Sequence, residues 1–155
     1  GVSFEGLFVE TPCFLRAMSR LYRKLLLTCS ALSAVAPVAA HANPEGGVVA
    51  AGSAVITQSG STVTIDQSSQ RAVIDWRSFN IAPNETTRFN QPSSSSHTLN
   101  RVNDTSRSVI EGTIQANGNI TIVNPNGVFF SSSSVVDVGG LVATSADVSN
   151  DAFMA

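Results

Sequence analysis

Residues 117–144 read NGNITIVNPNGVFFSSSSVVDVGGLVAT, a series of short apolar runs separated by turn-forming residues. Glycine and asparagine tolerate a positive φ, and proline fixes φ at about −65°, so the intervening segments favour tight turns. Strands this short cannot bury a face alone and must stack on neighbouring strands. The apolar runs lie at residues 120–123, 128–130, 135–138 and 141–143.

This pattern predicts coils of a β-solenoid, in which each strand pairs with the equivalent strand one coil away, at a spacing of about 4.8 Å. Corners of such coils need Asn and Gly, and inward positions need Val, Ile and Leu. A small antiparallel sandwich also fits short β-branched runs with glycine turns. The runs by themselves leave both architectures open.

Charge and cysteine usage divide the 155-residue chain near residue 43. Its single lysine, Lys24, and both cysteines, Cys13 and Cys29, precede that point. Beyond residue 42, five arginines stand against nine acidic residues, a formal charge of −4. This region therefore offers no basic surface for nucleic acid and no thiol for a disulfide or metal site.

Residues 18–42 have the pattern of a secretory signal peptide. A basic beginning with Arg20, Arg23 and Lys24 precedes an apolar run at residues 25–36, which is too short to span a membrane. Small residues then flank a cleavage site. We expect residues 1–17 to be an unstructured upstream extension, and residues 43–155 to form the mature domain. The residues that define cleavage are Ala40 and Ala42, with the cut after Ala42.

The mature sequence opens with two alternating runs, residues 54–58 and 62–66, joined by Ser59-Gly60-Ser61. Such a pair predicts a β-hairpin. We expect this hairpin to cap the solenoid, because an uncovered first coil would invite edge-to-edge association. No equivalent cap is evident near Ala155, so the chain is expected to be truncated at its C-terminal end or to be the first part of something longer.

Four large apolar residues follow the hairpin: Trp76, Phe79, Ile81 and Phe89. We predict that they anchor the core beneath the cap, although an aromatic ligand platform is the functional alternative. Strand spacing beyond residue 72 predicts coils of about 20 to 25 residues, three or four of which fit before the chain ends.

No convergent catalytic group is evident in the sequence. His97 is the only histidine beyond residue 42 and has no nucleophile elbow nearby. Asp66, Asp75 and Asp137 could in principle form the acid pair of a polysaccharide-cleaving β-helix, although lone carboxylates beside turns are usually solvated. Phosphate-binding loops, calcium loops and histidine clusters are absent from the sequence. We therefore expect no enzyme activity, no metal and no cofactor.

An ordered series of segments resembles the N-terminal secretion domain of two-partner secretion exoproteins, also called the filamentous-haemagglutinin N-terminal or haemagglutination-activity domain. A lone N-P-N-G would be weak evidence, but the series covers nearly all of the mature chain. The segments are VVAAGSAVITQSG (48–60), IDWRSFNI (74–81), RFNQPSSSS (88–96), LNRV (99–102), SVIEGTIQANGNITIVNPNGVFF (108–130), VDVGGLVAT (136–144) and DVSNDAFMA (147–155).

The resemblance implies a right-handed parallel β-helix with an N-terminal β-hairpin cap. It also implies export by the Sec translocon and recognition by an outer-membrane β-barrel transporter with periplasmic polypeptide-transport-associated domains. A second N-P-N-L motif of other branches is absent, and Ser131–Ser134 replace residues usual in relatives. The family's motif residues correspond to Asn124, Pro125, Asn126, Gly127 and Val128, and to Asn100, Arg101 and Val102.

These observations predict a secretion-targeting and folding-nucleation domain of a large adhesin, haemagglutinin or contact-dependent toxin. The product is expected at the surface of a Gram-negative bacterium or in its medium, after passage through the periplasm. Host-cell contact would belong to downstream repeats. Alternatives are a carbohydrate-binding or polysaccharide-acting β-helix, and a non-functional fragment of a truncated adhesin gene. Asn124 and Asn126 have two possible roles, satisfying backbone groups at a corner or contacting the partner.

Overall fold

The computed structural model describes residues 42–155, which form twelve strands and one short helix. Residues 1–41, with the predicted extension, most of the signal peptide and Ala40, lie outside the described residues. By contacts the chain divides into two units, Gly1–Ala39 and Ala40–Ala155, and the fold below is that of the second. No helix in the described part is long and apolar enough to cross a membrane.

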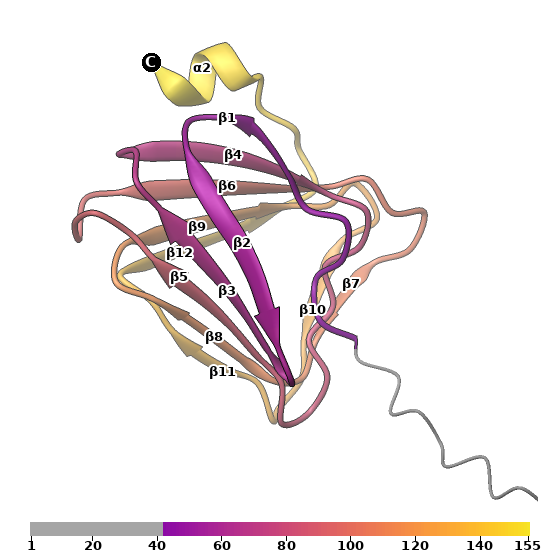
Figure 1. Ribbon diagram of the computed structural model, residues 1–155. Coiled ribbons are helices and arrows are strands. Elements are labelled where there is room, and N and C mark those ends of the chain that lie inside the picture. The colour runs from indigo at the N-terminus through magenta and orange to yellow at the C-terminus, as the bar shows by residue number, and fades with distance from the viewer. Residues whose placement is uncertain (1–41) are drawn as a thin grey trace, which may run out of the picture. The chain divides into compact units, whose positions relative to one another are not determined.

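The strands form three sheets, which are the sides of a coil (Figure 1). The first sheet contains, in spatial order, β1 (Val48–Ala51), β4 (Arg71–Trp76), β6 (His97–Val102), β9 (Asn119–Val123) and β12 (Gly140–Thr144). The second contains β2 (Ala54–Ser59), β3 (Thr62–Gln67), β5 (Thr86–Asn90), β8 (Thr113–Ala116) and β11 (Val135–Asp137). The third pairs β7 (Ser108–Ile110) with β10 (Val128–Phe130).

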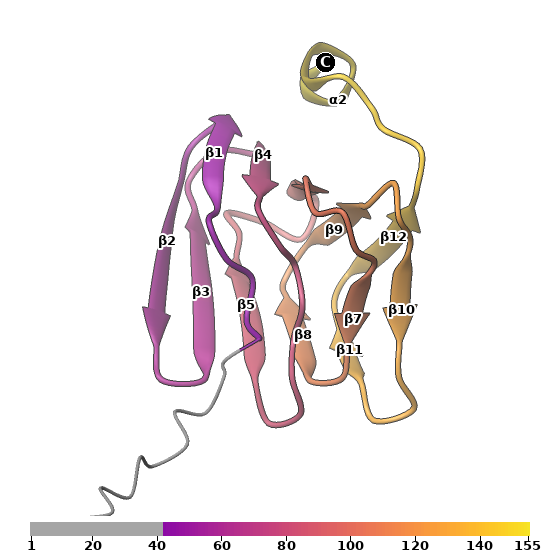
Figure 2. The ribbon, with the colours of Figure 1, turned by 90° about the vertical axis from the view of Figure 1, so that its right-hand side faces the viewer.

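Parallel pairing between consecutive coils establishes the solenoid. In the second sheet Thr62 pairs with Thr86, Thr86 with Thr113 and Thr113 with Val135, which are steps of 24, 27 and 22 residues. Figure 2 shows these strands side by side along the coil axis. The predicted right-handed parallel β-helix is confirmed, and the antiparallel sandwich is wrong.

The cap at the start of the solenoid consists of two antiparallel strands. The predicted hairpin is present, with β2 pairing β3 from Ala54↔Gln67 to Ser59↔Thr62 around Gly60, whose φ is 55°. Of the two hairpin strands, however, only β2 belongs to the cap. Strand β3 pairs in parallel with β5 and so belongs, with β4, to the first coil. On the other side β1 pairs antiparallel with β4. β1 and β2 therefore cover the edges of the first coil.

The core lies inside the coils, where alternate strand residues point inward. Trp76, Phe79, Ile81 and Phe89 all belong to it, each at most 1% exposed. Trp76 and Phe79 meet edge to face, with ring centroids 5.7 Å apart. The structure thus places these four side chains in the core and not on an exposed aromatic platform.

The last coil, made of β10, β11 and β12, pairs on one side only within the described residues. Its inward residues Val128, Phe130, Val138 and Leu141 pack against the core but are only partly buried. Val136 is 38% exposed. The described chain therefore has a covered first coil and an uncovered last coil.

Helix α2 (Asn150–Met154) follows the last strand and was not predicted. Ser149 caps its N-terminus by accepting a hydrogen bond from the Ala152 N–H. The helix lies beside β1 and β4, on the outer side of the first sheet (Figure 1).

Replacing Ile122 with Ala is expected to lower the free energy of unfolding by about 2 to 4 kcal/mol, because it leaves a cavity in a fully buried part of the core. Val55→Ala is the control, since Val55 lies on the cap and is 61% exposed, and it should change stability by less than about 0.5 kcal/mol. Urea unfolding measures both, and equal losses would contradict the assigned core.

Candidate functional site

The N-P-N-G turn connects β9 to β10 at a corner of the coil. The backbone N–H of Gly127 donates to the carbonyl of Asn124 at 2.9 Å and closes the turn. Gly127 has a φ of 96°, and an added Cβ would meet no atom within 4 Å. The backbone conformation, and not lack of space, therefore favours glycine at this position.

The Asn124 side chain is completely buried, and both its oxygen and its nitrogen form hydrogen bonds. Its Oδ1 accepts the backbone N–H of Asn126 at 2.9 Å. Its Nδ2 donates to the carbonyl of Ser106 at 3.1 Å and to Ser108 Oγ at 3.0 Å. Asn124 therefore ties its corner to the preceding coil, as the structural interpretation of this residue proposes.

The neighbours of Asn124 differ in exposure. Pro125 and Asn126 are exposed, whereas Val128 is half-buried against the core. Asn126 Nδ2 donates to the carbonyl of Asp104 at 2.8 Å. Pro125, the outer side of Asn126 and the partly exposed Gly127 are thus the parts of this motif that a partner could contact in the folded domain.

The N-R-V motif lies on β6, and its three residues face different surroundings. Asn100 is buried, accepts the Trp76 indole N–H at 2.9 Å and donates to the Thr121 carbonyl at 3.3 Å. Val102 belongs to the core. These two residues hold neighbouring coils together, and their side chains are buried in the folded domain.

Arg101 points outward but has little exposure, with 16% of its side chain accessible. Its guanidinium forms ion pairs with Asp75 at 2.9 Å and Asp147 at 2.8 Å. The hydrogen bond from Arg101 holds the pKa of Asp147 below its ordinary value. Both acids are missing from the predicted set of motif residues.

The two motifs lie together, because Arg101 pairs with Val123 in the parallel ladder between β6 and β9. Asn124 directly follows Val123, so both motifs occupy the same corner in consecutive coils. The sequence alone did not predict this proximity, because the two motifs are more than 20 residues apart in the chain.

The three carboxylates considered for catalysis are not brought together. Asp75 lies on the first sheet and pairs with Arg101, whereas Asp66 and Asp137 lie on the second sheet, on β3 and β11. β5 and β8 separate those two strands, so they lie about 14 Å apart at the usual strand spacing. An acid pair for glycoside hydrolysis needs at most about 9.5 Å, and the described residues contain no metal-binding cluster either.

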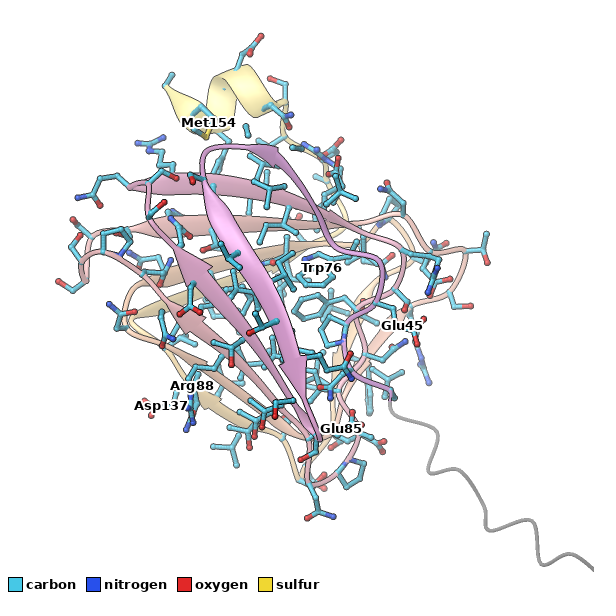
Figure 3. The ribbon with its side chains drawn as sticks, in the orientation of Figure 1. Glu45, Trp76, Glu85, Arg88, Asp137 and Met154 are labelled. Atoms are coloured by element: carbon cyan, nitrogen blue, oxygen red, sulfur yellow. The ribbon has the colours of Figure 1, made fainter. Side chains whose placement is uncertain are left out.

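A shallow groove of 530 Å³ runs along the outer side of the second sheet. Arg88 Nε donates to Gln115 Oε1 at 3.1 Å, and Asp137 pairs with Gln115 in the next ladder, on the side of the coil where Figure 3 labels both Arg88 and Asp137. Asp137 is the one carboxylate that lines this groove. The groove can offer hydrogen bonds but contains no acid pair.

The family comparison agrees with this geometry. Residues 40–155 match the model of the TPS secretion domain, that is, the secretion domain of two-partner secretion. The chain belongs to this family. Members are exported from Gram-negative cells and work with a transporter partner, and the family is one of secretion domains, not a known enzyme family.

Relatives and a solved structure cover most of the chain. Two heme/hemopexin-binding proteins of Haemophilus influenzae are 39% identical over 105 residues and 40% identical over 86 residues. These alignments cover 68% and 56% of this chain, but only 12% and 9% of the relatives. The crystal structure of the HMW1 secretion domain from the same species aligns with a TM-score of 0.69 and 30% identity, over 72% of this chain and 30% of that chain.

Replacing Asn124 with Ala should destabilise the protein by about 2 to 3 kcal/mol, because Ser106 and Ser108 lose a buried donor and the turn loses an acceptor. Asn126→Ala, which removes one exposed hydrogen bond, should cost about 1 kcal/mol or less. Chemical unfolding compares the two variants. A larger loss for Asn126 would contradict the roles given to them.

His97 is expected to make stability depend on pH. Its Nε2 contacts Thr121 Oγ1 at 2.8 Å and its ring packs against Phe153. Partial burial, and then the charge of Arg71, lower its pKa from the ordinary value of 6.5. A lowered pKa means that the folded protein binds this proton less well than the unfolded chain, so stability is complete above pH 6.5 and falls as the pH drops through the folded pKa.

Thermal unfolding between pH 7 and pH 5 measures this effect. His97→Gln should remove most of the decline while leaving an uncharged polar side chain in place. An unchanged pH profile in the variant would show that other groups cause the decline.

Proposed function

We propose that this domain directs secretion of a larger exoprotein and nucleates folding of that protein's β-helix. Membership of the two-partner secretion family, over residues 40–155, is the observation that carries this proposal. The relatives are many times longer than the matched region, which suits a targeting domain attached to a long passenger.

The asymmetry of the coil supports the nucleation role. Antiparallel strands β1 and β2 cover the edges of the first coil, so the parallel register of the coils ends there. At the other end β10, β11 and β12 present unpaired edges and half-buried apolar side chains. A further coil in parallel register would satisfy these edges and cover Val136, Phe130 and Leu141.

Recognition by the transporter is the finer part of the proposal. We infer that the signal peptide directs Sec export with cleavage after Ala42. Periplasmic polypeptide-transport-associated domains of the outer-membrane barrel then bind the chain, in part by adding one of its strands to their own sheet. In the folded state, Pro125 and Asn126 are the most exposed residues of the N-P-N-G motif.

The passenger is proposed to be an adhesin or haemagglutinin that reaches the cell surface or the medium and contacts host cells through downstream repeats. The matched relatives are named for binding heme and hemopexin, and the solved relative is HMW1. Their names differ although their secretion domains are similar. This difference supports placing the binding specificity of the passenger outside this domain.

Carbohydrate binding is the second candidate, favoured by the polar groove around Arg88, Gln115 and Asp137. Protein sites for sugars commonly add an exposed aromatic platform, but Phe89, the aromatic residue at this groove, is 1% exposed. The groove consequently ranks below secretion as a function.

Expression of the full chain in a Gram-negative host, with and without the cognate barrel transporter, tests the proposal. The protein should appear in the medium only when the transporter is present. The double variant Pro125→Ala, Asn126→Ala should be released at least several-fold less while folding nearly normally. Asn84→Gly is its control, because Asn84 is an exposed turn residue with a φ of 68° elsewhere on the coil.

Retention in the periplasm in the presence of the transporter would contradict the secretion function and favour a non-functional fragment. Normal release of the double variant would remove Pro125 and Asn126 from the recognition surface.

A further inference from the structure

Residues 145–155, here called the strap, lead from the last coil back across the outer side of the first sheet. β12 ends at Thr144 in the last coil, whereas α2 contacts β1 of the cap and β4 of the first coil. Figure 2 shows the chain rising from β12 and turning back toward β1 and β4. The strap therefore connects opposite ends of the described coil.

An apolar strip lies beneath the strap. Val73, Leu99 and Val123 come from three consecutive coils, face outward from the first sheet, and are nevertheless at most 1% exposed. Phe153 and Met154 of the strap pack against them. Covering this strip removes an apolar surface that would otherwise face water.

Arg101 fastens the middle of the strap. Besides its ion pair with Asp147, its guanidinium donates to the Val148 carbonyl at 2.7 Å and to Asn150 Oδ1 at 3.0 Å. Its remaining contact, with Asp75, is to the first coil. One guanidinium on β6 therefore joins the first coil, the second coil and the strap, and the planar fork suits this better than a lysine ammonium would.

The end of the strap is held by the first and second coils. The Arg71 guanidinium donates to the carbonyl of Phe153 and lies 6.0 Å from the centre of its ring. The His97 ring meets the same side chain edge to face at 5.1 Å. These contacts come from β4 and β6, whose residues Arg71 and His97 are partners in the parallel ladder, so the end of the strap is held by two paired strands.

We propose that Arg101 is a positioning residue, which latches the strap across the stacked coils, and not a contact to the transporter. In a solenoid each coil normally interacts only with its neighbours, so the stack frays from an open end. The latched strap couples the last coil directly to the first and second. The latch itself does not depend on the proposed secretion function. Only the statement that Arg101 does not contact the transporter rests on that function.

Amide hydrogen exchange tests the latch in the purified protein. The N–H groups of Phe153 and Ala155, which bond within the strap, should exchange about tenfold faster in Arg101→Met than in the wild type, because charge-assisted hydrogen bonds are lost. Arg101→Lys should restore part of the protection. Arg77→Met is the matched control, since Arg77 pairs with Glu45 at 2.6 Å on the exposed cap side. It should leave the strap unchanged.

A second variant covers the case in which Arg101→Met fails to fold. Asp147→Asn removes the charge of the exposed partner of Arg101, which weakens the latch, and leaves the Arg101–Asp75 ion pair intact. It should also accelerate exchange in the strap. Unchanged strap exchange in both variants would overturn the latch.

Transporter-dependent release separates the latch from recognition. Arg101→Met should reach the medium at the wild-type level, but with a strap that proteases cleave more readily. Periplasmic retention of this variant, with normal strap protection in the purified protein, would make Arg101 a transporter contact and overturn the assignment. Failure of the wild type to be released would instead contradict the secretion function, and strap exchange would still decide the latch.

Discussion

The structure depends on the backbone hydrogen bonds of consecutive parallel strands. Every strand of a coil has two edges, and each edge must be paired, covered or left to water. At the first coil, β1 and β2 run antiparallel to β4 and β3 and end the parallel ladder. At the last coil β12 pairs only with β9 in the described chain. The parallel register of the coils is consequently open at the last coil alone in the described chain, which supports the proposed nucleation role.

Buried asparagines tie neighbouring coils together, one at a corner and one within a strand. Asn124 bonds to Ser106 and Ser108 in the preceding coil, and Asn100 bonds to Trp76 in the coil before it. An unpaired amide in such a place would be costly, so each of these side chains specifies one register. Asn100 and Asn124, which a motif search would assign to partner binding, therefore have structural roles in the folded domain. Within the N-P-N-G motif, Pro125 and Asn126 are the residues that are most exposed.

Much of the fold could be predicted from the sequence, because the apolar runs at residues 120–123 and 128–130 alternate with Asn and Gly turns, and the residues inside each coil are local in sequence. The strap could not. Its helix has five residues, and the partners of Arg101 lie 46 to 49 residues away on the strap and 26 residues away at Asp75. The alternation of apolar residues along the chain does not predict side-chain contacts between residues so far apart in the sequence. His97 appeared only as an isolated base, since its packing against Phe153 depends on the same distant segment.

The most direct test of the directional account is amide exchange of equivalent residues in β6, β9 and β12 in the native protein. β6 and β9 are paired on both sides, whereas one edge of β12 is free. The account predicts slow exchange throughout β6 and β9, and fast exchange of those β12 amides that point away from β9. Uniformly slow exchange across all three strands would contradict an open last coil and, with it, the proposed nucleation role.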